Sequence, residues 1–370
     1  MQSGIGQKKY NNFTMVRLAA TIFVFAGHMG VLLGMQPPLF GSFPVHELGV
    51  GILFLISGYL ITMSWLSDPH PIRYGIRRFF RLWPPFAVMI LIMVFIAGPL
   101  LSDLGIRGYF QSGYKAYLLN LRFFIVYIQP GVFSTLPYAN TTNGSLWTMP
   151  VEAFLYILTP FLLTVLRVKC RSRKSFCITA VLTALCVGLD LYLRIGCPDA
   201  RVVFYGTDWI AAYHLAVFYM IGILYTYQEA KAHLNLQIGC GAMCLLLITQ
   251  FSAGWLQCTL LYLILPYAVF SFVFAAKPVF SGLERMPEIS YGIYLYGFFF
   301  QQLIISLGQR YGISLSYSEA LALSGLLTVA AALLSCFLVE RPALRFSRWL
   351  TRKALTKGGQ KQYTEANKRE

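Results

Sequence analysis

The chain is 370 residues long, and its composition is too apolar for a soluble protein of that length. Hydrophobic residues make up 57% of it and charged residues only 12%, whereas a soluble domain carries about 25% charged residues. A soluble fold is therefore excluded, and a polytopic helical membrane protein is predicted. The net charge of +16 is spread over separate loops, so nucleic acid is not an expected partner.

Long apolar runs predict an all-α fold with about ten transmembrane helices. The expected spans are 14–33, 48–66, 82–101, 146–166, 176–194, 208–227, 236–251, 256–275, 289–308 and 319–339. With these spans, 24 of the 30 Lys and Arg residues fall on one side of the membrane. The positive-inside rule makes that side cytoplasmic, so both termini are predicted to lie inside.

The first span carries two ionisable residues, Arg17 and His28, in MVRLAATIFVFAGHMGVLLG. At ~100° per residue both lie on one stripe of a helix, about 16 Å apart along its axis. Ionisable groups at membrane depth usually face a cavity or a reaction site, and histidine readily moves a proton near neutral pH. A histidine bonded to a neighbouring helix and a snorkelling arginine are the structural alternatives.

The second span, LGVGILFLISGYL, is rich in small residues and follows His46 and Glu47. Its small residues predict close packing against neighbouring helices. They are Gly49, Gly51, Ser57 and Gly58. Glu47 is a weak candidate for the acceptor side of a site, and packing is the favoured interpretation of this stretch.

The segment PIRYGIRRFFRLWPPF places three arginines just before the third span. Arg77 and Arg81 share a helix face, and Arg78 lies next to them. Arginine suits bidentate contacts with phosphate at a membrane edge. An ordinary cluster that sets topology is the alternative. Pro84 and Pro85 fit the start of the next helix.

Residues 118–133 (LLNLRFFIVYIQPGVF) are apolar but short, interrupted by Arg122 and stopped by Pro130. A full crossing here would invert every later loop and place the basic residues 167–174 outside. We therefore expect a re-entrant or interfacial segment on the outer side, within a long loop over about 102–145.

Glu152, in SLWTMPVEAFLYILTPFLL, is the next ionisable residue whose placement in a membrane costs free energy. With the helix starting near Ser145, Glu152 lies about 9 to 10 Å below the outer surface, close to the depth of about 8 Å estimated for His28. A carboxylate at that depth needs a partner. A His28–Glu152 pair would be a general base with the group that orients it. Pairing of Glu152 with Arg122 or a tyrosine hydroxyl is the alternative.

Weaker candidates for an acceptor cleft follow later in the chain. They are Asp208, Trp209 and His214 at the outer start of the sixth span, and Tyr291, Tyr294 and Tyr296 in the ninth. No paired-cysteine or H-E-x-x-H spacing occurs, so no metal is predicted. Residues 1–345 are expected to form one membrane domain, and 346–370 a basic cytoplasmic tail.

Taken together, these motifs resemble the acyltransferase-3 family of integral-membrane O-acyltransferases. The resemblance runs from Arg17 to about Pro342. It rests on RLAATIFVFAGH, GVGILFLISGYLI, RRFFRLWPPF, SLWTMPVEAFLY, SYGIYLYGF and VERP. The motifs are loose singly, but their order and spacing are specific. One departure is Tyr296, where the family often has histidine.

The resemblance implies transfer of an acyl group, acetyl favoured, from cytoplasmic acyl-CoA to a carbohydrate hydroxyl on the outer side. Such acceptors include O-antigen, capsule, exopolysaccharide or a lipid-linked glycan. It implies that His28 and Glu152 are catalytic and that Arg17 and the arginines 77, 78 and 81 bind the donor. Acetyl-CoA would be a co-substrate, with no permanently bound cofactor. The expected location is a bacterial inner membrane among its lipids, and a homo-oligomer is left open.

A transporter or flippase is the competing class. Intramembrane Arg, His and Glu also serve as proton relays in such proteins. That class predicts repeat symmetry between the two halves of the chain and helices broken by Gly or Pro at matching positions. Neither feature is evident in the sequence, which favours the enzyme.

Overall fold

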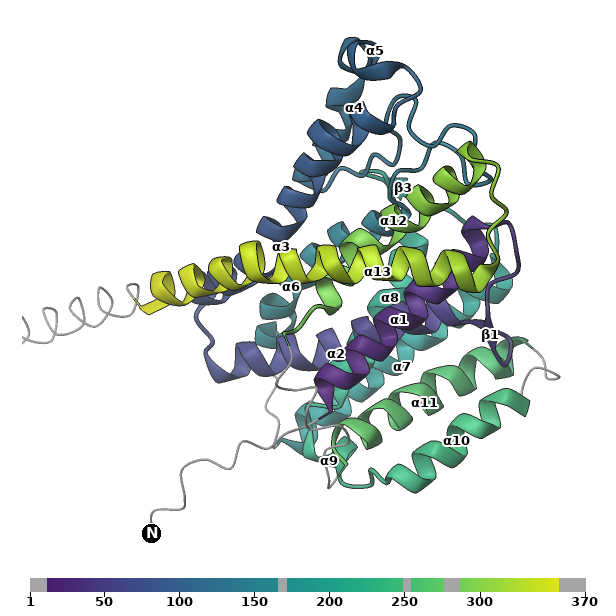
Figure 1. Cartoon of the computed structure of the whole chain (residues 1–370). Helices are drawn as coiled ribbons and strands as arrows, with labels where there is room; N and C mark the ends of the chain where they lie inside the picture. The colour runs from purple at the N-terminus through teal and green to yellow at the C-terminus, as the bar shows by residue number, and fades with distance from the viewer. Residues whose placement is uncertain (1–11, 166–171, 249–253, 276–286, 353–370) are drawn as a thin grey trace, which may run out of the picture.

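The computed structural model describes residues 12–165, 172–248, 254–275 and 287–352, and most of them are helical (Figure 1). The helices are α1 (Phe13–Leu32), α2 (Val45–Ser67), α3 (Pro71–Ile92), α4 (Gly98–Leu101), α5 (Gly105–Gln111), α6 (Thr148–Val165), α7 (Arg173–Gly196), α8 (Trp209–Leu224), α9 (Gln228–Lys231), α10 (Leu236–Ile248), α11 (Gly254–Val273), α12 (Ser290–Arg310) and α13 (Tyr317–Ser335). Two 3₁₀ helices, Tyr114–Arg122 and Gly144–Trp147, precede α6.

Two short antiparallel ribbons are the only strands among the described residues. In one, β1 (Leu39–Phe40) pairs with β2 (Phe43–Pro44) ahead of α2. In the other, β3 (Val203–Phe204) pairs with β4 (Thr207–Asp208) ahead of α8. Each ribbon has only two residues per strand, so the fold is all-α as predicted, and the ribbons serve as tight connections between helices.

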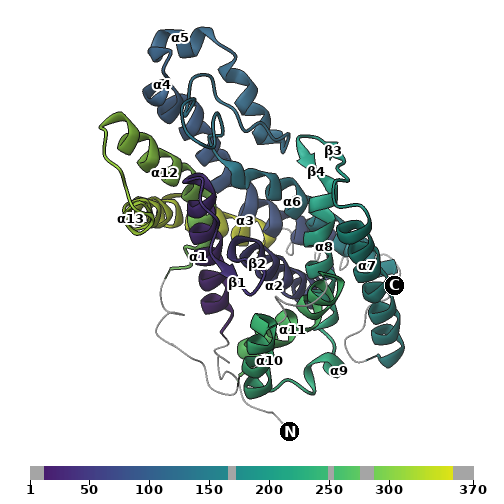
Figure 2. The same ribbon diagram turned by 90° about the vertical axis from the view of Figure 1, so that its right-hand side faces the viewer.

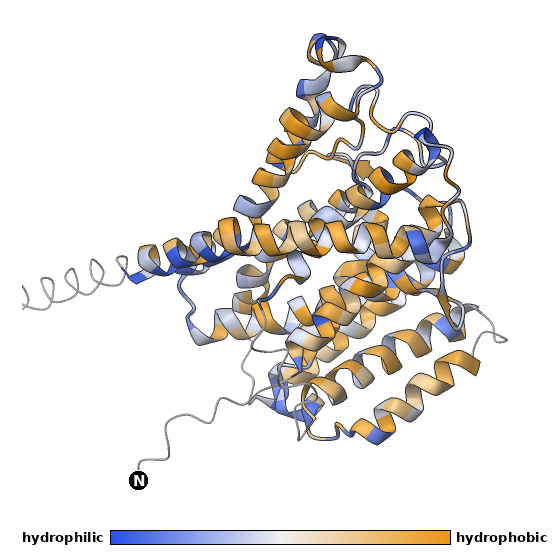
Figure 3. Cartoon of the chain, viewed as in Figure 1, coloured by the Kyte–Doolittle hydropathy of each residue, from blue (hydrophilic) through white to orange (hydrophobic). Residues whose placement is uncertain are grey.

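Each of the ten expected spans overlaps a helix of the structure. Seven helical segments in the described ranges are long and apolar enough to cross a membrane, while α8 and α10 are apolar but shorter. Large apolar side chains on helix exteriors are open to the surroundings, among them Ile157 at 76% and Leu326 at 72% exposure. Figure 3 shows apolar residues over the outer helices. The protein is therefore an all-α polytopic membrane protein.

Helix α2 lies at the centre of the bundle, between α1 on one side and α8 on the other (Figures 1 and 2). A Cβ atom on Gly49 would lie 2.5 Å from the Ala20 carbonyl oxygen of α1, and one on Gly58 would lie 2.0 Å from the Tyr219 carbonyl oxygen of α8. Only glycine permits such close approach. The predicted packing role of Gly49 and Gly58 is confirmed.

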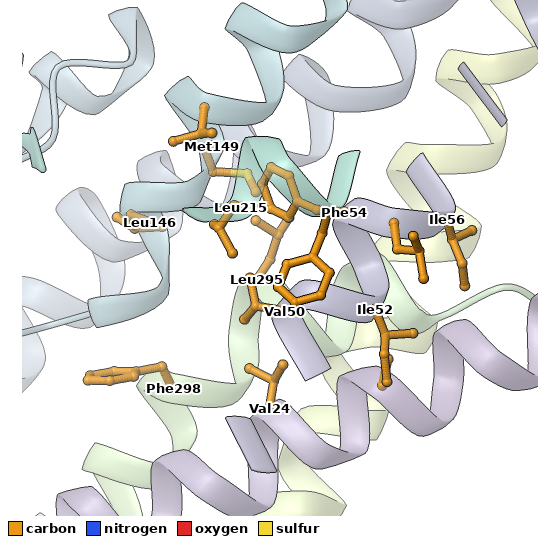
Figure 4. Close-up of a cluster of buried hydrophobic side chains, with 14 of the residues drawn as sticks. Val24, Val50, Ile52, Phe54, Ile56, Leu146, Met149, Leu215, Leu295 and Phe298 are labelled. Atoms are coloured by element: carbon orange, nitrogen blue, oxygen red, sulfur yellow. The ribbon is translucent and has the colours of Figure 1, made fainter. Parts of the chain in front are cut away.

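The core lies where α1, α2, α6, α8 and α12 converge. Figure 4 shows its side chains interdigitating around α2, among them Phe54, Met149, Leu215 and Leu295. Phe298, at the edge of this cluster, also contacts the imidazole of His28. The core thus supplies one wall of the region in which the ionisable side chains gather.

Helix α3 begins earlier than the sequence indicated. It starts at Pro71, where the His70 side chain accepts a hydrogen bond from the Arg73 amide. Pro84 and Pro85 lie inside it and do not mark its start. Through a π-helical turn, Met93–Ala97, it continues into α4. The expectation of a helix beginning at the prolines was wrong, because a proline at the first turn and a capping side chain upstream set an earlier start.

Residues 118–133 do not form a membrane-crossing helix. The 3₁₀ helix ends at Arg122, and Phe123 follows with a φ of 61°. The Asn120 side chain then bonds the amide and carbonyl of Val126, which folds the chain back on itself. This agrees with the expected non-crossing segment.

Helix α13 continues through a π-helical turn, Cys336–Glu340, and on to residue 352. Its end projects from the bundle and carries hydrophilic residues (Figure 3). The first residues of the expected tail are therefore helical. Residues 353–370 and several basic loop positions used in the charge count, including 167–171, Lys277 and Arg285, lie outside the described residues.

Candidate active site

Arg17 lies near the start of α1 and points to Glu288, just before α12. Its Nη2 atom lies 2.8 Å from Glu288 Oε2, and Arg81 Nη2 lies 3.3 Å from Glu288 Oε1. Burial works to raise the pKa of Glu288, but Arg81 and Arg17 outweigh it and hold that pKa below its ordinary value. One carboxylate thus bridges two of the arginines predicted to bind the donor.

The remaining arginines of the motif have other partners. Asp68 accepts hydrogen bonds from both Arg73 and Arg77, which hold its pKa well below the usual range. Arg78 donates to Ser64 Oγ at 2.6 Å. Nevertheless, Nε and Nη2 of Arg77 and Nε of Arg78 are buried without a hydrogen-bond partner. Such donors can still bind an anionic ligand.

Three further arginines, which the sequence did not mark as site candidates, face this motif. The helix beyond α13 carries Arg341, Arg345 and Arg348, and these line a cavity of about 510 Å³ together with Arg77, Arg78 and Arg81. We call this the arginine cavity. The 341, 345, 348 spacing puts the three side chains on one helix face. That spacing was the signal in the sequence that could have identified them.

A second cavity, of about 130 Å³, adjoins the first and is here called the central cavity. Arg78 and Arg81 line both cavities, and Arg17, Glu152 and Tyr294 also line the central one. The Tyr156 hydroxyl donates a hydrogen bond to the Glu152 carboxylate. The structure does not bring Glu152 to His28. The predicted pair does not form, because the partner is a tyrosine one turn along the same helix, the alternative that the sequence left open.

His28 lines a third cavity, of about 520 Å³, here called the histidine cavity. The centre of its ring lies 5.5 Å from that of His46 and 5.4 Å from that of Phe298. A Cβ atom on Gly27 would lie 2.6 Å from Cβ of His46, so glycine is needed for the two imidazoles to lie side by side. Within the described residues, the His28 side chain makes no hydrogen bond. It is therefore open to a ligand.

The three cavities follow one another through the bundle. Arg78 and Arg81 are shared by the arginine and central cavities, and Val50 and Tyr294 by the central and histidine cavities. The Tyr294 hydroxyl lies 2.7 Å from Thr148 Oγ1 at the second junction. The series connects the arginine motif to His28.

The weaker candidates separate into two groups. Glu47 and His214 line the histidine cavity, and Tyr291 lines the central cavity with its hydroxyl donating to the Leu82 carbonyl. Asp208 instead caps α8 and pairs with Arg201 at 3.1 Å. Tyr296 is buried among hydrophobic side chains and lines neither the central cavity nor the histidine cavity. The structure therefore brings only some of these residues to the region of His28.

A buried acidic network beside the histidine cavity was not anticipated. Asp190 of α7 is fully buried, and its carboxylate contacts His214 Nδ1, Arg194 Nε and the Tyr262 hydroxyl. The pattern D-x-x-x-R on one helix face was the local signal. Its contact with His214 depends on how α7 packs against α8, which the sequence does not show.

The polar groups that could hold a ligand are thus guanidinium groups at one end of the series, and imidazoles with the Arg194 guanidinium at the other. Across the described ranges, no group of three or more His, Cys, Asp or Glu side chains is placed to hold a metal ion.

The fold is a multi-pass helical bundle in which half-buried histidine and arginine side chains line a row of cavities, and it defines a polytopic membrane protein. The family model described as an acyltransferase domain matches residues 10–341. The chain therefore belongs to the acyltransferase-3 family, and the predicted membership is confirmed. It is a membrane-bound acyltransferase.

Several relatives align with the chain. Nodulation protein 10 of Rhizobium leguminosarum bv. viciae is 27% identical, over 94% of this chain and 96% of the relative. An O-acetyl transferase of Shigella phage Sf6 is 25% identical, over 93% and 97%. The peptidoglycan O-acetyltransferase OatA of Listeria monocytogenes is 26% identical, over 67% of this chain and 44% of its own length. No solved structure matches.

Proposed function

We propose that this protein transfers an acetyl group from cytoplasmic acetyl-CoA to a carbohydrate hydroxyl on the outer side of a bacterial inner membrane. The observation that carries the proposal is the series of cavities from the arginine cavity to His28. Two relatives are named as O-acetyltransferases, which supports acetyl as the group and a hydroxyl oxygen as the acceptor.

The donor would enter at the arginine cavity. Coenzyme A carries several phosphates, and guanidinium groups bind phosphate through paired N–H donors. Six arginines line this cavity. The long pantetheine arm would then extend past Arg17 and Glu152 in the central cavity and present the thioester to the histidine cavity. Glu152 accordingly belongs to the donor path in this proposal, where its carboxylate is held by Tyr156.

His28 would act at the thioester as general base. The imidazole accepts the proton of the acceptor hydroxyl as its oxygen attacks the thioester carbonyl. The C–S bond then breaks, and the departing thiolate takes the proton from the imidazolium. Ester and free thiol are the products, and the histidine returns to its neutral form. His46 and Phe298 hold the imidazole in place by ring contacts.

Purified protein tests this proposal directly. Labelled acetyl-CoA is supplied with a panel of methyl glycosides to wild type, His28→Asn and, as a matched control, His233→Asn, whose side chain is exposed. We expect His28→Asn to lose acyl transfer by about 10²-fold or more and to keep its affinity for the donor. The control should retain wild-type activity.

Retained transfer in His28→Asn would contradict the role of His28 as base. A wild-type protein that binds acetyl-CoA but acylates no hydroxyl would contradict the transferase proposal as a whole. The competing transporter or flippase would instead move a glycan across a reconstituted vesicle without consuming thioester.

A further inference from the structure

The Asp190 network lies at a junction between two cavities. His214 and Arg194 line the histidine cavity, and both also line a neighbouring cavity of about 450 Å³. Asp208 and Arg201 line this neighbouring cavity as well, beside the β3–β4 ribbon. A ligand that passed from the ribbon towards His28 would contact His214 and Arg194 on the way.

Asp190 fixes the orientation of the His214 and Arg194 side chains. Its carboxylate accepts the Nδ1–H of His214, so the neutral ring carries its lone pair on Nε2. The carboxylate also accepts the Arg194 Nε–H at 2.9 Å, which leaves the terminal N–H groups of the guanidinium for a ligand. Tyr262 donates to the same carboxylate and completes its shell. The site therefore presents one acceptor and several donors, side by side.

This combination matches adjacent oxygens of a polyhydroxylated ring. Nε2 of His214 can accept from one hydroxyl, while the guanidinium of Arg194 donates to the next oxygen. The walls of the histidine cavity add flat apolar surface from aromatic side chains, which suits the C–H face of a sugar. They are Tyr127, Tyr138, Trp147 and Phe298.

Resting on the proposed function, we infer that His214 and Arg194 form the subsite that binds the sugar acceptor. Asp190 is the positioning residue that holds both. His214 engages a ring hydroxyl other than the reacting one and thereby turns the reacting hydroxyl towards His28, which lines the same cavity. The class of ligand is a pyranoside with neighbouring free oxygens.

Equilibrium binding tests the subsite without requiring turnover. Methyl glycosides of gluco, galacto and rhamno configuration, with their monodeoxy analogues, are titrated against purified full-length wild type and against His28→Asn, His214→Gln, Asp190→Asn and the control His233→Gln. We expect His214→Gln to raise the Kd of the preferred glycoside about five- to tenfold. The control His233→Gln should bind as wild type does, because its side chain is exposed.

The monodeoxy analogues separate direct contact from a structural role. Removing the one hydroxyl that His214 binds should weaken binding to wild type but not to His214→Gln, a non-additive result expected only for interacting groups. If Asp190→Asn does not fold, the comparison of wild type with His214→Gln across the monodeoxy analogues still tests the subsite.

Equal Kd values for wild type and His214→Gln, or no binding of any glycoside by wild type, would overturn the subsite. Loss of glycoside binding in His214→Gln alongside wild-type protein that transfers no acyl group would keep the subsite and reject the proposed transferase reaction. Loss of transfer in His28→Asn with unchanged binding in His214→Gln would keep the proposed transferase reaction and reject the subsite.

Discussion

Several charged side chains in the described part of this bundle have a partner of opposite charge. Arg17 and Arg81 share Glu288, and Asp190 is held between Arg194 and His214. Unpaired charges at membrane depth are costly, so such pairing is expected. His28 differs, because its ring meets other rings and has no hydrogen-bond partner in the described part of the chain. At the residue scale, this distinguishes a group kept for a ligand from groups held by the fold.

The bridge at Glu288 predicts an effect of pH on stability. Its lowered pKa means that its ion pairs contribute stability above about pH 4.3, the ordinary value for glutamate. That contribution is lost as the pH falls through the lowered pKa. We expect Glu288→Gln to reduce the unfolding free energy at pH 7 by about 1–2 kcal/mol. This is less than a fully buried pair would show, because these side chains are about a quarter exposed.

Thermal unfolding in detergent, followed from pH 7 down to about pH 3, measures this effect. The difference between wild type and Glu288→Gln should shrink as the pH falls through the lowered pKa of Glu288, because the native carboxylate then becomes protonated and, like glutamine, neutral. A difference that stayed constant with pH would rule out the ion-pair explanation.

At the scale of elements, two helices far apart in the sequence build the arginine cavity. Helix α3 supplies one half and the continuation of α13 the other. Neither half encloses a cavity alone. The centre of the bundle likewise depends on two helices together, because α2 approaches α8 so closely that glycine is required.

Replacing Arg345 and Arg348 by alanine should weaken donor binding. A hydrogen bond to a charged group contributes about 1.5–3 kcal/mol, so we expect the KM for acetyl-CoA to rise about tenfold or more, with little change in the KM for the acceptor. Arg352→Ala on the same helix is the matched control, because Arg352 does not line the cavity. Equal rises in both KM values would indicate a general loss of structure.

Gly58→Ala should destabilise the bundle by about 1–3 kcal/mol, because the added methyl group would lie 2.0 Å from the Tyr219 carbonyl oxygen. Gly75→Ala is the matched control in α3, where an added Cβ meets nothing within 4 Å. It should be neutral or gain about 0.5–1 kcal/mol. Melting temperatures in one detergent compare the two, and a Gly58→Ala protein as stable as wild type would refute the packing constraint.

At the scale of the whole molecule, each of the ten expected spans overlaps a helix, and seven of the described helical segments are long and apolar enough to cross alone. The shorter α8 and α10 pack against longer neighbours, α2 and α11. Helix α12 carries buried polar groups such as Gln301 and Gln302, whose side-chain amides bond backbone carbonyls. Backbone carbonyls within the bundle thus accept hydrogen bonds from amide N–H groups that lipid could not satisfy.

An even number of crossings predicts that both termini lie in the cytoplasm. A reporter that works only in the cytoplasm should be active when fused at residue 370. A reporter that works only outside the cytoplasm should be active when fused within the 134–141 loop. The basis is the concentration of Lys and Arg on one side. A C-terminal fusion active on the outer side would require an odd number of crossings.

Much of this architecture follows from local patterns. Apolar runs located most helices to within a few residues, and the glycines of α2 located its close contacts. Arg17, Arg78 and Arg81 line one cavity, and their role in binding the donor stays a prediction. The start of α3 was missed, since a proline pair inside a helix looks like a helix start.

Apolarity and charge distribution determined by themselves that this is a helical membrane protein, because the bilayer constrains each span separately. The order of the motifs determined by itself the resemblance to the acyltransferase-3 family. Only the tertiary structure decided which ionisable groups meet. Glu152 and His28 have similar estimated depths, yet they line different cavities, while Asp190 and His214 meet through the packing of α7 on α8. Depth can be estimated from position along one helix, but a contact also requires the rotation and neighbour of each helix, which packing of the whole bundle sets.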